Sequence, residues 1–115
     1  MNPQIKQKWV DALRSGEYQQ TQRYLRTDNG FCCLGVLCDL YAKENNVEWN
    51  LVNNGHNYEF QDKESYLPSS VRKWAGVKSH NADFIINETR TETLANLNDM
   101  GFAFNEIADV IEKQL

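Results

Sequence analysis

Apolar residues spaced three or four positions apart predict helices at both ends of the chain. A first helix over residues 3–14 has Pro3 in its first turn and Gly16 just beyond its end, which are favoured places for these residue types. A short helix over residues 68–75 stops at Gly76. One face of a last amphipathic helix carries Phe104, Ile107, Ala108, Ile111 and Leu115.

Residues 31–43 form the most apolar segment, and apolar side chains surround nearly its whole helical circumference. A helix that is apolar on all sides is buried on all sides, so we expect this segment to be the central helix. Within it, Gly35 would let another backbone approach closely. Asp39 is the exception, because a carboxylate there must be paired or must point away from the buried face.

The Asn-rich segment 44–66 predicts a short β-hairpin. Its turn is the Asn-Asn-Gly sequence at residues 53–55, which separates the alternating stretches 48–52 and 57–61. Asn-Gly between such stretches is a strong hairpin signal.

A candidate strand over residues 84–86 precedes a further helix. Thr89 and Glu92 have the spacing of a capping box, which would begin that helix. Its apolar face would carry Leu94, Leu97 and Met100. The fold class is therefore α+β, mostly α: a small single domain over residues 1–115 with a central buried helix, flanking amphipathic helices and a short β-hairpin.

Composition agrees with an ordinary globular domain. The 115 residues are 41% hydrophobic and 24% charged, with a net charge of −4, whereas a disordered chain has fewer apolar residues and a larger net charge. No apolar run approaches the roughly 18 residues of a membrane span, and the polar N-terminus lacks the apolar core of a signal peptide. We therefore expect a cytosolic protein that does not enter a membrane.

Three cysteines, Cys32, Cys33 and Cys38, lie in the central apolar segment. An odd number within one short segment is not a disulfide framework. A zinc ion would need a fourth ligand, and neither His56 nor His80 has a familiar ligand spacing. We expect buried free thiols, with no metal and no cofactor.

The last two predicted helices, joined through residues 101–103, have the outline of a helix-turn-helix. Residues 88–115 contain two basic and six acidic residues, and the second helix carries Glu106, Asp109 and Glu112. A DNA reader needs basic side chains to neutralise phosphates, so we do not expect binding to duplex DNA.

The segment over residues 14–26, which runs from the end of the first helix into the polar connector of residues 17–30, holds the strongest candidates for a binding site. Arginine offers a planar fork for phosphate, and tyrosine offers a ring for stacking plus a hydroxyl. The residues expected to supply this chemistry are Arg14, Tyr18, Gln20, Arg23 and Arg26. The alternative is that the arginines pair with Asp28, Asp39 or the acidic C-terminal region.

Asn98 and Asp99, at the end of a predicted helix, are further candidates for ligand binding, because they could read ring nitrogens or ribose hydroxyls. Local hydrogen bonds near the helix end are the alternative. Trp9 and Trp74 occupy core positions, whereas Trp49 in the hairpin is either core or a contact to a ligand or an interface.

The inventory of catalytic residues is thin. The sequence has no Gly-rich phosphate loop and no nucleophile elbow. Cys33 with His56 or His80 would be a nucleophile–base pair only if the fold joined them, and a buried thiol is a poor nucleophile. Asp39 with Asp99 is the other conceivable pair, but a chain of this length offers several such pairs. We do not expect an enzyme.

The segment FCCLGVLCD, residues 31–39, resembles the central motif of a family of small proteins encoded by bacteriophages and prophages. Ala103 departs from the family pattern, because a Ser or Thr there would cap the last helix. The other blocks that resemble this family, in the same order, lie within residues 9–20, 66–76, 94–101 and 104–112.

The resemblance implies a protein made in the host bacterial cytoplasm and supplies no catalytic residue. Small non-enzymatic phage proteins often disable host defences, some by binding a nucleotide immune signal. The first hypothesis is therefore a small-molecule binding protein that sequesters a nucleotide-type host immune signal without cleaving it, as a homo-oligomer with sites near subunit junctions. The alternative is an inhibitor that binds a basic surface of a host protein through its acidic C-terminal helical face.

Overall fold

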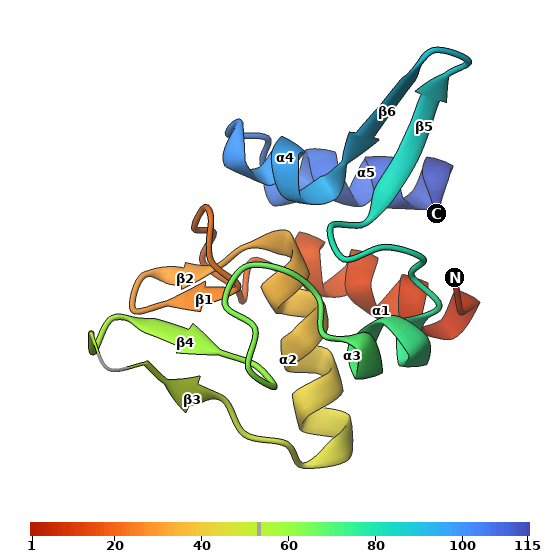
Figure 1. Cartoon of the computed structure of the whole chain (residues 1–115). Coiled ribbons are helices and arrows are strands. Elements are labelled where there is room, and N and C mark those ends of the chain that lie inside the picture. Colours follow the sequence, from red (N-terminus) through yellow and green to blue (C-terminus); the bar gives the residue numbers. More distant parts are fainter. Residues whose placement is uncertain (53) are drawn as a thin grey trace.

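The computed structural model describes residues 1–52 and 54–115, which form an α+β fold, as predicted (Figure 1). Its helices are α1 (Pro3–Arg14), α2 (Cys33–Asn45), α3 (Ser69–Ala75), α4 (Leu94–Asp99) and α5 (Phe104–Gln114). Its strands are β1 (Arg26–Thr27), β2 (Gly30–Phe31), β3 (Asn50–Leu51), β4 (Asn57–Glu59), β5 (Asp83–Asn87) and β6 (Arg90–Thr93). Within the described chain, every helix is too short or too polar to span a membrane.

Helix α2 is the centre of the arrangement. It contacts α1, α3, α4 and β2, and α1 also packs along α5. The antiparallel sheet, with strand order β2-β1-β4-β3, lies beside α2, whereas the β5–β6 hairpin projects away from the body of the molecule (Figure 1).

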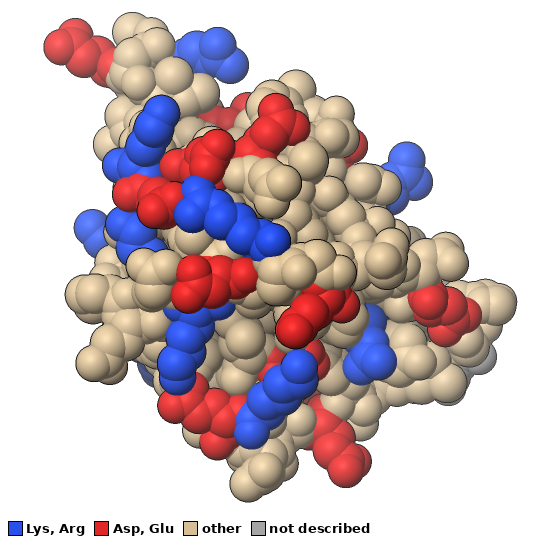
Figure 2. Space-filling model, turned by 180° about the vertical axis from the view of Figure 1, so that it is seen from behind, with Lys and Arg blue, Asp and Glu red and all other residues tan. Residues whose placement is uncertain are grey.

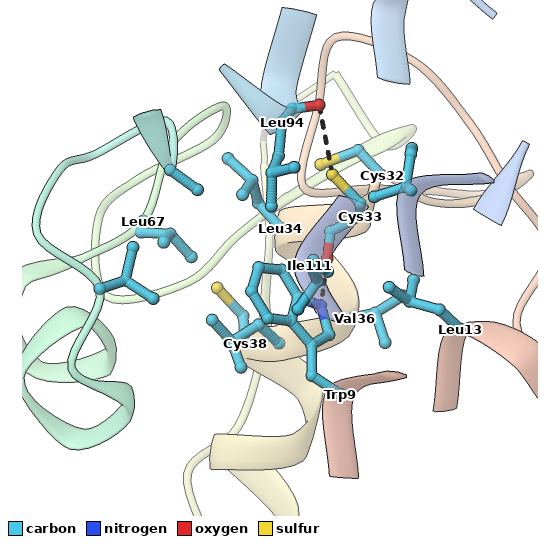
Figure 3. Packing of buried hydrophobic residues seen from close by; sticks show 14 of the residues in the cluster. Trp9, Leu13, Cys32, Cys33, Leu34, Val36, Cys38, Leu67, Leu94 and Ile111 are labelled. Carbon is cyan, nitrogen blue, oxygen red and sulfur yellow. Dashed lines mark hydrogen bonds between the residues drawn. The ribbon is translucent and has the colours of Figure 1, made fainter. Parts of the chain in front are cut away.

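The N-terminal half of α2 is buried on every side. All residues from Cys33 to Cys38 are buried, and Trp9 donates its indole N–H to the carbonyl oxygen of Cys33 over 3.0 Å. Figure 3 shows Trp9 and Leu13 of α1 meeting Ile111 of α5 around this part of α2. The three cysteines are free and buried, as predicted.

The chain that enters the sheet lies directly on α2 at Gly35. A Cβ atom at Gly35 would be 1.7 Å from the carbonyl oxygen of Leu25, so the predicted close approach is confirmed. The same carbonyl accepts a hydrogen bond from the N–H of Cys32 over 3.2 Å, and the N–H of Leu25 donates to the backbone carbonyl oxygen of Glu64 over 2.6 Å. Leu25 is fully buried, although the connector around it is too polar for the core.

The connector predicted over residues 17–30 contains a β-hairpin. Strand β1 pairs with β2 in antiparallel register, and Gln20 forms a parallel bridge with Phe31. Because Phe31 belongs to strand β2, the central helix begins at Cys33 rather than at residue 31.

The Asn-Gly hairpin is confirmed. Strands β3 and β4 are antiparallel, with Leu51 opposite Tyr58. Both strands are shorter than expected, and Asn53 of the expected turn lies outside the described residues. The candidate strand at residues 84–86 is also confirmed, as part of β5.

The expected capping box at Thr89 and Glu92 is wrong. Thr89 lies in the turn of the β5–β6 hairpin and Glu92 lies in β6, because strand pairing keeps the chain extended up to Thr93. The N-cap of α4 is Thr93 itself, whose Oγ1 accepts from the N–H of Asn96 over 3.0 Å. Met100, expected on the buried face, is 63% exposed.

Helix α5 has half of a capping box. The N–H of Ala103 donates to the carboxylate of Glu106 over 3.0 Å, but alanine has no side-chain oxygen with which to reciprocate. Trp74 of α3 is half-buried, and its ring centroid is 5.2 Å from that of Tyr41, so it lies at the margin of the core.

We predict that Gly35→Ala destabilises the protein by about 3 kcal/mol or more, because the added methyl group collides with the Leu25 backbone. Gly16→Ala is the matched control. Gly16 has a positive φ of 77° but no atom within 4 Å of an added Cβ, so this variant should lose only about 1 kcal/mol. Urea unfolding measures both, and equal losses would contradict the role of the close contact.

Candidate functional site

Asn98 is fully buried at the end of α4, and its side chain joins three segments of the chain. Its Oδ1 accepts from the N–H of Cys33 over 3.1 Å and from Nε2 of Gln20 over 2.9 Å. Its Nδ2 donates to the carbonyl oxygen of Thr21 over 2.8 Å. The N-cap residue Cys32 makes no side-chain hydrogen bond to the first turn of α2. Asn98, from a distant part of the sequence, instead accepts a hydrogen bond from a backbone N–H at the start of this helix.

Asp99 holds the backbone of the connector. Its Oδ1 accepts from the N–H of Arg23 over 2.7 Å. Arg23 has a positive φ of 73°, a conformation that costs a residue with a side chain about 1 kcal/mol. Asn98 and Asp99 therefore lie against the connector that contains Gln20, but the hydrogen bonds described for these three residues serve the fold.

Arg14 pairs with the acidic face of α5. Its guanidinium lies 2.5 Å from the carboxylate of Asp109 and also contacts Glu112. Hydrogen bonds to Glu112 and then to Asp109 raise the pKa of Arg14 above its usual range. The pairing of arginine with the C-terminal region, left open by the sequence, is therefore found at Arg14. Acidic and basic side chains are likewise interspersed on the face shown in Figure 2.

Three groups bind the carboxylate of Asp39. Among the described residues, no arginine pairs with it. The Tyr18 hydroxyl donates to Oδ2 over 2.6 Å, and the Trp49 indole N–H donates to Oδ1 over 3.1 Å. The Lys43 amine lies 3.3 Å from Oδ2. Burial, followed by the hydrogen bond to Asp39, raises the pKa of Tyr18 to about 12.

Arg26 lies among aromatic rings. Its Cζ is 4.4 Å from the ring centroid of Tyr58, 5.0 Å from that of Phe31 and 5.6 Å from that of Trp49, distances at which a cation is attracted to a ring face. Within residues 1–52 and 54–115, its guanidinium forms no ion pair. We call these four residues the arginine–aromatic cluster.

Strand register explains the cluster. Phe31, Arg26, Tyr58 and Leu51 lie opposite one another across the order β2-β1-β4-β3. Residues that are opposite one another in a sheet project from the same face. Trp49 lies just before β3, and its ring is placed beside Arg26 by the distance given above. A fork-shaped cation beside planar rings can bind an anion and stack on a planar ligand.

The structure brings together only two of the predicted site residues at this cluster. Tyr18 meets it through Phe31, at 5.0 Å between ring centroids, and Arg26 is its centre. The sequence does not single out Phe31, Lys43 or Tyr58. Alternation about the Asn-Gly turn is a signal for Tyr58, but the pairing of β4 with β1 is long-range and no local pattern predicts it.

A hollow of about 410 Å³ lies beside the connector, and the residues that line it include Thr21, Gln22, Tyr24, Thr27, Asp28, Asn29, His56 and Asn57. His56 Nδ1 is 3.0 Å from the carboxylate of Asp28, which joins two turns. Thr27 and Asn57 are opposite each other, one position along from Arg26 and Tyr58. They therefore project from the other face of the sheet, and the hollow is separate from the cluster.

The cysteine thiols are poorly suited to catalysis. Burial raises the pKa of Cys32 to about 11 and raises the pKa values of Cys33 and Cys38 well above their usual range. A protonated, buried thiol is a weak nucleophile. In the part of the chain that the structure describes, no group of three His, Cys, Asp or Glu residues is placed to hold a metal ion.

The fold and the cluster define a small α+β domain with an arginine-centred aromatic face. The family model described as Domain of unknown function (DUF8296) matches residues 1–115, and the chain belongs to this family. No curated protein and no solved structure matches the chain.

We predict that Asn98→Ala destabilises the protein by about 3 kcal/mol, because it leaves the N–H of Cys33 and the carbonyl of Thr21 without their partner. Asn96→Ala, at an exposed position of the same helix, should cost about 1 kcal/mol or less. Thermal unfolding compares the two. Similar losses would show that Asn98 does not join the three segments energetically.

A second prediction concerns alkaline pH. Because the folded protein raises the pKa of Tyr18 from 10 to about 12, this group's contribution to stability is complete below pH 10 and is lost as the pH rises through about 12. Tyr18→Phe should therefore lose less stability than the wild type over this interval. Urea unfolding at a series of pH values measures the difference, and parallel profiles would contradict the partly buried hydrogen bond from Tyr18 to Asp39.

Proposed function

We propose that this protein binds a nucleotide-type small molecule at the arginine–aromatic cluster and holds it without cleaving it. The observation that carries the proposal is the Arg26 guanidinium, which lies over aromatic rings and has no ion-pair partner among the described residues. Stacking restrains the fork, so less side-chain entropy would be lost when a phosphate group binds.

Neighbouring groups add to this chemistry. Tyr18 contacts Phe31 of the cluster, and the Lys43 amine is 5.4 Å from the ring centroid of Tyr18. The negative charge of Asp39 is offset by Lys43 and by two hydrogen-bond donors. The half-buried rings of Trp49 and Tyr58 would contribute apolar surface to a planar base.

The resemblance to phage proteins extends the proposal. A phage-encoded protein of this kind would act in the host bacterial cytoplasm and sequester a nucleotide immune signal, and the homo-oligomer stays a prediction. The alternative, an inhibitor that binds a host protein through its acidic helical face, has less support because Arg14 already pairs with Asp109 and Glu112.

Arg26 variants test the proposed site. Linear and cyclic nucleotides are screened by thermal shift, and the affinity of each hit is measured by calorimetry. Arg26→Leu should weaken binding about tenfold to a hundredfold, because charge-assisted hydrogen bonds are lost. Arg26→Lys keeps the charge but loses the fork, so its affinity should be intermediate. Arg90→Leu, which removes an exposed arginine from β6, is the matched control and should bind as the wild type does.

Three results would contradict the proposal. They are the absence of any thermal shift with nucleotides, unchanged affinity in Arg26→Leu, and mass spectrometry that shows the ligand returned as a cleaved product. Circular dichroism of each variant establishes that a loss of binding is not a loss of fold.

A further inference from the structure

A second group of cations lies at the end of α3, on elements that the proposed function does not use. A pocket of about 290 Å³ there is lined by Ser69, Arg72, Lys73, Gly76, Val77 and Lys78. Three of these residues are cationic, and no acidic residue is among the described residues that line the pocket. This is a local excess of positive charge in a chain whose net charge is −4.

The backbone brings these cations together. Helix α3 ends at Gly76, which has a φ of 74°, and the N–H groups of Gly76 and Val77 both donate to the carbonyl oxygen of Arg72, over 2.7 and 3.0 Å. The chain thereby turns back, and the Arg72 guanidinium donates to the carbonyl oxygen of Lys78. Neutral backbone groups therefore shape the pocket, and they leave its positive charge in place.

The positive charge is not neutralised by the described part of the protein. Arg72, Lys73 and Lys78 form no ion pair with residues 1–52 or 54–115. The Nε–H of Arg72 is buried and has no hydrogen-bond partner among them. A buried donor without an acceptor is unfavourable, and like charges around one pocket repel one another. An anion beside the lysine amines and the outer guanidinium nitrogens would offset this repulsion, whereas the buried Nε–H is closed to such an anion.

We propose that this pocket binds a phosphate group, either as inorganic phosphate or as a small phosphomonoester. The double negative charge of phosphate suits three cations, and its oxygens accept hydrogen bonds from the two lysine amines and the guanidinium. The volume of about 290 Å³ is at the lower end for small-molecule sites, so a compact ligand fits. The site shares no residue with the arginine–aromatic cluster and does not depend on the proposed function.

An NMR titration of the full ¹⁵N-labelled chain with inorganic phosphate, and separately with glycerol phosphate, tests this site. At constant pH and ionic strength, the amide signals of Gly76 and Val77 should shift and reach saturation. Lys73→Gln combined with Lys78→Gln should weaken the affinity about tenfold or more. The matched control, Arg90→Gln combined with Lys113→Gln, removes the same charge from other elements and should leave the affinity unchanged.

The proposal is overturned if Gly76 and Val77 show no saturable shift with either probe, or if both double variants bind equally. Saturation with glycerol phosphate alone would assign the pocket to phosphomonoesters. Arg26→Leu must keep the response of Gly76 and Val77, since its loss would place the phosphate at the arginine–aromatic cluster instead. Failure of this site is thus distinguishable from failure of the proposed nucleotide site.

Discussion

The carbonyl of Leu25 lies on α2 at Gly35, so closely that no residue with a Cβ atom fits there, and the proposed binding face depends on this contact. Arg26 is the next residue along the chain, and its position in β1 sets the register of both neighbouring strands. The contact is between the backbone carbonyl of Leu25 and the α2 backbone at Gly35, which has no side chain to keep the two apart. The central helix therefore positions the strand directly and leaves the Arg26 side chain out of this contact.

A second constraint acts on the same connector a few residues earlier. Asn98 holds Gln20 and Thr21 against the start of α2, and Asp99 holds the backbone of Arg23. These amides and carboxylates are the residue types that also read polar ligands, which is why the sequence alone left both roles open. Their described partners show that they position the connector, and the proposed binding chemistry lies with the stacked Arg26.

Local patterns predicted most of the helices, one hairpin and the special role of Gly35, because helical periodicity and Asn-Gly turns act over a few residues. Interactions between distant segments account for most of the differences. Thr89 and Glu92 match a capping box, but pairing of β5 with β6 competes for that segment and keeps it extended. The cluster around Arg26 needs β1 beside β4, and the intervening chain offers no local signal for that pairing.

Three arginines show why net charge is a poor guide to what an acidic protein can bind. Arg14 is neutralised by two carboxylates, Arg26 lies over aromatic rings, and Arg72 contacts a backbone carbonyl. Binding to duplex DNA requires a broad basic surface that neutralises many phosphates, and the acidic last helix argues against such a surface. Binding of one phosphate group requires only a few well-placed donors. An overall charge of −4 therefore disfavours binding to duplex DNA, whereas binding of one phosphate group depends on local geometry.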